Sequence, residues 1–294
     1  MPARPKTALI GAATGVALLF VIWFAAFHIG VLKHVDQSVF GGFLGLGAHS
    51  SVHAIATFIA DLCNPSPYVY FAAVPLLIGL ARGRPRVAVA AGAMMLGANA
   101  TTQLFKPLLA EPRPTALLHT QLSAASWPSG HATAAMSLAL AFVLVSPSRL
   151  RPYVAALGAG FAAAVSYSFL SLGWHYPSDV LGGFLVATTW SLLILAALLW
   201  VNGQRERTTP RPLRVREALT PPAAALGGAL ALAGAVVAAR PHEVLSYARA
   251  HQAFTVGATG IGLLALALAT AVVVVRTGTY RAPTMAPRRR SRRG

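Results

Sequence analysis

Eight long apolar segments constrain the fold of this chain more than any other feature of its sequence. A helix needs about 20 mostly apolar residues to cross the roughly 30 Å hydrocarbon core of a bilayer. Only 11% of the 294 residues are charged, against roughly 25% in soluble domains. The apolar segments are Ala8–Val31, Tyr68–Ala81, Val87–Phe105, Ala132–Val145, Val154–Leu172, Val180–Val201, Ala223–Ala239 and Phe254–Val275. The sequence therefore predicts an all-α polytopic membrane helix bundle.

Two stretches fit this pattern less well. Tyr68–Ala81 is too short to cross the core at 1.5 Å per residue, so we expect its helix to start earlier or to tilt. The region Asp36–Asn64 mixes glycines with polar residues, and we interpret it as a loop with an interfacial helix.

The basic residues alternate between the connections that join the apolar segments. Most of the 24 lysines and arginines fall before the first segment, after the last one, or in every second connection between them. Because basic connections stay on the cytoplasmic side, this alternation predicts a cytoplasmic-membrane protein with both termini in the cytoplasm. It also explains the net charge of +17 without nucleic acid binding, which we exclude as a function.

An arginine-rich connection divides the chain into unequal parts. We predict a six-span core at residues 1–201 and a basic cytoplasmic linker at residues 202–222. Residues 223–275 form a predicted two-span hairpin, whose small residues suit helix packing and offer a surface for oligomerisation. Residues 276–294 form an arginine-rich tail that we expect to be disordered against anionic headgroups. Cys63 is the single cysteine, which excludes an intrachain disulfide.

One polar cluster, Trp127-Pro128-Ser129-Gly130-His131, directly precedes an apolar segment on the predicted extracytoplasmic side. Ser129 is a suitable N-cap, and the free amides at a helix start bind anions. His131 adds a titratable ring. An ordinary capped helix would also explain these residues.

A second cluster on the same side runs from Ser168 to Asp179 and places His175 four residues before Asp179. A carboxylate can accept the Nδ1 proton of such a histidine, which leaves the Nε2 lone pair free for attack. A structural histidine, half-buried at the membrane edge, is the alternative.

A third cluster runs from Lys106 to Pro114 and contains Arg113 among prolines that stiffen the connection. Two cations in a rigid frame suit phosphate oxygens, and an arginine can bind them with two parallel hydrogen bonds. Snorkelling of both side chains to lipid headgroups is the alternative.

Together the three clusters supply what phosphoryl transfer without a metal requires: donors for the phosphate oxygens, a general acid and a nucleophile. Their order is Lys-x6-Arg-Pro, then Pro-Ser-Gly-His, then Ser-x6-His-x3-Asp. This pattern resembles the three-part signature of the type 2 phosphatidic acid phosphatase family, which shares its site architecture with vanadium haloperoxidases.

The resemblance implies a membrane phosphatase that hydrolyses a lipid phosphate or diphosphate, such as polyprenyl diphosphate or phosphatidic acid, at the outer face. His175 would form a phosphohistidine, Asp179 would orient it, and His131 would protonate the leaving oxygen and then activate water. The residues implied to bind the substrate phosphate are Lys106, Arg113, Ser129, Gly130 and Ser168. Neither a metal nor another cofactor is implied.

One position departs from the signature. The family's third motif has an arginine after its serine, whereas Phe169 follows Ser168 here. Loss of one such donor typically costs about 2.7–4 kcal/mol of transition-state stabilisation. Slower turnover, a changed substrate and a donor from elsewhere all stay open. The candidate donors are Tyr167, Ser168, Ser171, His49 and His53.

Two other functions are compatible with the sequence. Phe169 would suit a catalytically weak lipid-binding or transport protein that retains the phosphatase fold. A metal site could use His49 and His53, four residues apart, or His131, His175 and Asp179.

Overall fold

The computed structural model describes residues 5–109, 111, 126–203, 213–277 and 279–280. These residues form eleven helices and two short parallel strands, β1 (Leu213–Arg214) and β2 (Thr279–Tyr280), so the prediction of an all-α bundle is confirmed. The helices are α1 (Pro5–His28), α2 (Gly30–Gly47), α3 (Ser50–Asp61), α4 (Pro65–Ala81), α5 (Pro85–Leu109), α6 (Gly130–Val145), α7 (Arg151–Ser171), α8 (Pro177–Gly203), α9 (Val215–Ala239), α10 (Pro241–Ala250) and α11 (Gln252–Thr277). As expected, the second apolar helix starts before Tyr68.

Fewer helices than predicted meet the length and hydropathy of a membrane span. Within the described residues, α1, α7, α8, α9 and α11 meet both, and α2 with α3 makes a sixth if the pair is one span broken by a bend of 108°. Helices α4 and α6 are apolar but shorter. Helix α5 carries polar residues such as Asn99 and Thr102, which bond to neighbouring helices. The chain is a multi-pass membrane helix bundle, and the predicted count of eight exceeds the count that length and hydropathy support.

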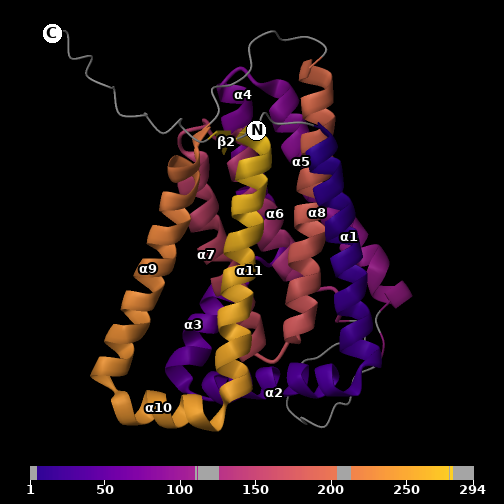
Figure 1. Ribbon diagram of the computed structural model, residues 1–294. Coiled ribbons are helices and arrows are strands. Elements are labelled where there is room, and N and C mark those ends of the chain that lie inside the picture. The colour runs from indigo at the N-terminus through magenta and orange to yellow at the C-terminus, as the bar shows by residue number, and fades with distance from the viewer. Residues whose placement is uncertain (1–4, 110, 112–125, 204–212, 278, 281–294) are drawn as a thin grey trace, which may run out of the picture.

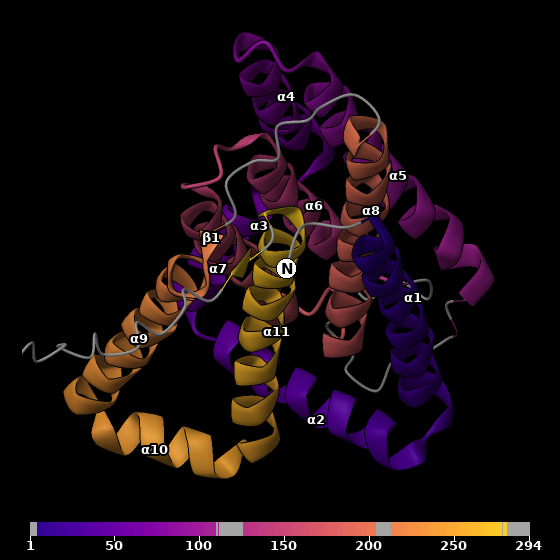
Figure 2. The same ribbon diagram turned by 45° about the horizontal axis from the view of Figure 1, so that its top comes forward.

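The helices form an upright bundle that is closed at one end by helices lying across it. Figure 1 shows α1, α8, α9 and α11 along the long axis, with α2 and α10 across the end opposite the N-terminus. Turning the molecule (Figure 2) keeps α2 and α10 at this end. The region Asp36–Asn64, predicted to contain a loop, is therefore mostly two helices.

The core lies where α5, α6, α7 and α8 meet. Helix α6 is buried along almost its whole length, and Met94 and Phe184 pack beside it without solvent exposure. Helix α11 joins this core through Ile261, Ala265 and Ala269. Helix α9 packs against the bundle near its start, where its described buried side chains lie, and is mostly exposed beyond that point. The two helices of the predicted hairpin thus differ, and α10 between them was not predicted.

Candidate active site

The starts of α6 and α8 are joined at the closed end of the bundle. Ser129 caps α6, since its Oγ accepts a hydrogen bond from the Ala132 amide at 3.2 Å. The Ser129 amide donates to the Asp179 carbonyl in the first turn of α8 at 2.9 Å. A Cβ at Gly183 would lie 2.7 Å from the Ser129 carbonyl oxygen, so glycine permits this close crossing. Two predicted clusters, distant in sequence, are therefore held in one place.

Gly173 turns the chain from the end of α7 toward His175. Its φ of 75° is a left-handed conformation that glycine adopts without strain. The Gly173 amide donates to the Leu170 carbonyl at 3.1 Å, and the Trp174 amide donates to the Phe169 carbonyl at 2.9 Å. These two bonds are a Schellman motif, which ends the helix and fixes the direction of the segment after it.

His175 and Asp179 form a buried pair. His175 Nδ1 lies 3.4 Å from Asp179 Oδ2, and the side chains are 8% and 0% exposed. The same Oδ2 accepts a hydrogen bond from the Tyr176 amide at 2.9 Å. Nδ1 has no hydrogen-bond partner among the described residues, so the two atoms approach each other without hydrogen-bond geometry. Catalytic hydrogen bonds are often long before substrate binds.

Lys106 reaches the start of α6 from the last turn of α5. A Cβ on Gly130 would lie 3.8 Å from Lys106 Nζ, and the charge of Lys106 interacts with His131 and Asp179. Lys106, Gly130 and His131 also line one cavity. The third predicted cluster, from Lys106 to Pro114, therefore joins the other two through Lys106. Arg113, its other cation, lies outside the described residues.

His131 is stacked on the residue that departs from the family signature. The rings of His131 and Phe169 are nearly parallel, with centroids 4.1 Å apart, and Phe169 is fully buried. The His131 and His175 centroids are 5.9 Å apart, and Trp174 lies 5.1 Å from Phe169. The position that an arginine would occupy therefore faces both histidines, and here it supplies an aromatic surface.

The residues that could replace the missing arginine as donors differ in their contacts and exposure. Tyr167 Oη donates to the Ala258 carbonyl at 2.6 Å and Ser168 Oγ donates to the Ala164 carbonyl at 2.9 Å, so both protons are already used. His49 is exposed in the bend between α2 and α3, and His53 is exposed on α3. Ser171 is buried at the end of α7. The role of Ser168 in phosphate binding stays a prediction.

Asp36 on α2 is a site residue that the sequence did not reveal. Its Oδ1 accepts a hydrogen bond from the Ser178 amide at 2.9 Å, and its Oδ2 accepts one from Ser178 Oγ at 2.7 Å. The carboxylate thus caps the start of α8, directly beside Asp179, and is 9% exposed. No local signal could have indicated this contact, because Asp36 and Ser178 are 142 positions apart.

A cavity of about 680 Å³ extends from this site between α4, α5 and α6. Its wall is mostly apolar, with Lys106, Gly130 and His131 at one end. The other lining residues are Cys63, Pro65, Tyr68, Val69, Ala72, Ala73, Leu76, Gly92, Met95, Leu96, Asn99, Gln103 and Ala134. Burial raises the pKa of the Cys63 thiol to about 12, so this residue stays protonated and does not compete as a nucleophile. Tyr68, Asn99 and Gln103 add polar atoms to the wall, and Asn99 Nδ2 donates to Tyr68 Oη at 3.4 Å.

The arrangement offers acid–base and nucleophilic chemistry next to an anion site. Two histidines, a carboxylate, a lysine and the free amides of a helix start converge. Within the described ranges, His, Cys, Asp and Glu side chains form no group of three or more that could hold a metal ion.

Comparisons with known proteins agree with the predicted resemblance. Residues 87–203 match the PAP2 superfamily, and this range contains all three clusters. A crystal structure of a transmembrane PAP2-type phosphatidylglycerolphosphate phosphatase from Bacillus subtilis has a TM-score of 0.54 and 19% identity. That match covers 67% of this chain and 98% of the other, and it shows that the fold is shared.

Two curated relatives carry related names. An undecaprenyl-diphosphatase from Sulfolobus acidocaldarius is 38% identical over 27% of this chain and 37% of its own length. Undecaprenyl-diphosphatase BcrC from Bacillus subtilis is 28% identical over 52% of this chain and 79% of its own. The chain thus spans little more than a third of the first relative and about four fifths of the second.

Proposed function

Since the resemblance to the type 2 phosphatidic acid phosphatase family is confirmed over residues 87–203, we propose that this chain is a membrane phosphatase of lipid phosphates or diphosphates. The names of its relatives favour a polyprenyl diphosphate such as undecaprenyl diphosphate, and a glycerophospholipid monophosphate comes second. The charge alternation favours a site on the extracytoplasmic side.

The proposed reaction has two steps on one phosphorus atom. His175 Nε2 attacks the terminal phosphorus and forms an N–P bond, while the bond from phosphorus to the leaving oxygen breaks and His131 donates a proton to that oxygen. Water then attacks the phosphohistidine. His131, now neutral, takes a proton from this water, and His175 leaves with its ring restored.

Asp179 stabilises the charged His175 ring during this cycle, since its Oδ2 already lies 3.4 Å from Nδ1. Lys106 and the free amides at the start of α6 hold the phosphate oxygens, and Arg113 would add a donor. Ser168 would donate to the phosphate only after giving up its bond to the Ala164 carbonyl. The chemistry requires no metal. The rate should be bell-shaped with pH, because His131 must begin protonated and His175 neutral.

The cavity between α4, α5 and α6 carries the proposal of a lipid substrate. A phosphate at His131 and Lys106 places the rest of its molecule in a mostly apolar cavity of about 680 Å³. A water-soluble phosphate would leave this apolar wall unused. An amphiphile with a phosphate head and a hydrocarbon chain matches both ends.

Substitutions on α4 test this assignment. Ala72→Trp places a large ring in the cavity, whereas Val74→Trp is the matched control, since Val74 lies on the same helix, is 39% exposed and does not line the cavity. We expect Ala72→Trp to reduce phosphate release from a polyprenyl diphosphate at least tenfold, with little effect on a short water-soluble phosphate. Equal losses on both substrates would contradict a lipid-chain cavity.

The second candidate is a lipid-binding or transport protein that retains the fold. It is favoured by Phe169, which stands where the family signature has an arginine. If folded, purified protein releases no phosphate from any lipid phosphate, the lipid-binding or transport function is supported and the phosphatase function is rejected.

A further inference from the structure

Two arginines are buried at the end of the bundle opposite the histidines. Arg151 begins α7 and is 4% exposed, and Arg276 lies in the last turn of α11 and is 7% exposed. Arginine is almost never buried unless it is paired, because a charge taken out of water loses its hydration. The proposed reaction, at the other end, uses neither.

More positive charge surrounds this pair. Arg276, Arg84 and Arg82 all lie close enough to repel Arg151, and Arg84 also repels Arg276. Arg82 and Arg84 occupy the turn between α4 and α5, which Gly83 fixes with a φ of 65°. Their positions are therefore set by the fold. We call these four residues the arginine cluster.

The described residues supply little to offset this charge. Arg151 Nε donates to the Ser146 carbonyl at 3.2 Å. No carboxylate among the described residues forms an ion pair with any member of the cluster. Glu217 is the described carboxylate that follows α8 in the sequence. Its side chain accepts a hydrogen bond from the Arg214 amide, which is not part of the arginine cluster. Repelling, buried cations of this kind call for an anion, and no described residue supplies one.

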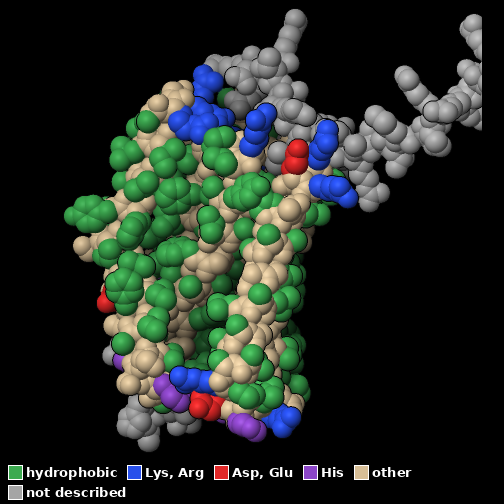
Figure 3. Space-filling model, turned by 90° about the vertical axis from the view of Figure 1, so that its left-hand side faces the viewer, with side chains coloured by type: hydrophobic (Ala, Val, Ile, Leu, Met, Phe, Trp, Pro, Cys, Tyr) green, Lys and Arg blue, Asp and Glu red, His purple; other side chains and the backbone are tan. Residues whose placement is uncertain are grey.

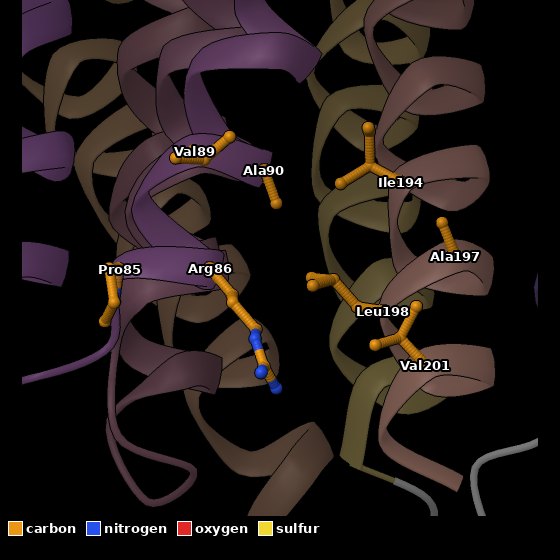
Figure 4. Close-up of a pocket in the computed structure, with 8 residues that line it drawn as sticks. All are labelled: Pro85, Arg86, Val89, Ala90, Ile194, Ala197, Leu198 and Val201. Atoms are coloured by element: carbon orange, nitrogen blue, oxygen red, sulfur yellow. The ribbon is translucent and has the colours of Figure 1, made fainter. Parts of the chain in front are cut away.

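An apolar groove at the same end of the bundle indicates what kind of anion binds there. A cavity of about 400 Å³ lies between the start of α5 and the end of α8. Figure 4 shows Arg86 reaching from α5 toward α8 among apolar side chains. These are Pro85, Val89, Ala90, Ile194, Ala197, Leu198 and Val201. The end of α11 packs on α8 nearby, since Val275 joins Leu195 and Ala196 in one apolar cluster.

We propose that the arginine cluster binds the phosphate headgroup of an anionic phospholipid, whose hydrocarbon chain lies in the groove between α5 and α8. Guanidinium groups suit phosphate oxygens, and basic pockets between membrane helices are a known type of lipid-headgroup site. The groove distinguishes a lipid from free phosphate, because an inorganic ion would use none of its apolar wall. The site is separate from the candidate active site and independent of the proposed function.

Thermal unfolding of the full chain in detergent tests the proposal. Phosphatidylglycerol should raise the melting temperature by roughly 5 °C at saturating lipid, while phosphatidylcholine and inorganic phosphate should not. Arg151→Gln and Arg276→Gln should abolish this rise. Without lipid they should melt no lower than the wild type, since each removes repulsion. Arg240→Gln, at an exposed residue of the opposite end, is the matched control and should keep the rise.

Three outcomes would overturn the proposal. Equal stabilisation by inorganic phosphate would show an ion site without lipid specificity. An undiminished rise in Arg151→Gln and Arg276→Gln would place the lipid elsewhere. A rise that appears in Glu206→Gln but not in the wild type would show that this carboxylate, which follows α8 in the sequence, neutralises the arginines. If either buried variant fails to fold, Arg84→Gln, at a half-buried position, replaces it and should also lose the rise.

Discussion

The two ends of this bundle handle charge in opposite ways. In Figure 3 most of the visible lysine and arginine side chains gather at one end, and the histidines lie at the other end beside a few basic and acidic side chains, across a broad hydrophobic band. At the histidine end, the buried carboxylates of Asp36 and Asp179 accept hydrogen bonds from the chain itself. At the arginine end, Arg151 and Arg276 lie buried beside other cations. The first end is organised before a ligand arrives, whereas the second needs a ligand to balance it.

Among the changes at the histidine end, removal of the carboxylate beside His175 should reduce the rate of phosphate release most. Asp179→Asn keeps the shape but loses the charge that stabilises a protonated His175, so we expect phosphate release to fall roughly 10³- to 10⁴-fold. Asp61→Asn, at an exposed carboxylate outside the site, should retain activity. Steady-state phosphate release measures both, and a loss of less than tenfold for Asp179→Asn would remove this residue from the mechanism.

The second carboxylate should have an intermediate effect, because it acts through the backbone. Asp36→Ala removes the cap that holds the Ser178 amide and hydroxyl, so we expect kcat to fall roughly 10- to 100-fold with a smaller change in KM. Asp36→Asn retains one acceptor and should recover part of the rate. If the two variants lose stability but keep the wild-type kcat, Asp36 is structural only.

The aromatic stack on His131 should have the smallest effect. An aromatic pair is worth about 0.5–1.5 kcal/mol, so Phe169→Leu should slow turnover roughly two- to tenfold, and Phe169→Tyr should not. Phe169→Arg replaces the stack with a donor and should tighten inhibition by vanadate, which mimics the transferring phosphate. Unchanged vanadate inhibition in this variant would show that the phosphate site already has enough donors.

The sequence predicts the local features of this molecule well. Apolar runs located the long helices, and Ser129 was identified as a helix cap from its neighbours alone. The described residues of the three clusters lie near one another, because each cluster is at a helix end on the same side of the bundle. Spacing within a motif is a local property, so it survives in the fold.

Long-range contacts could not be predicted in this way. The bond between Asp36 and Ser178 depends on how α2 crosses the end of the bundle, and the stack of Phe169 on His131 depends on how α6 packs against α7. The packing of α11 into the core and the exposure of most of α9 likewise follow from side chains of other helices. Both helices are apolar enough to span a membrane, with a mean hydropathy of 1.8 for α9 and 2.4 for α11, so composition alone does not show that only α11 packs into the core.

The central claim is that His175 carries the phosphoryl group, and trapping that intermediate tests it most directly. Protein mixed with a polyprenyl diphosphate labelled on its terminal phosphate is quenched within milliseconds and assayed for acid-labile, base-stable label. We expect label on the wild type and none on His175→Ala. In His131→Ala both formation and loss of the label should be slower, because His131 is the acid of the first step and the base of the second. Label on folded His175→Ala, or rapid turnover of the wild type without any label, would contradict the account.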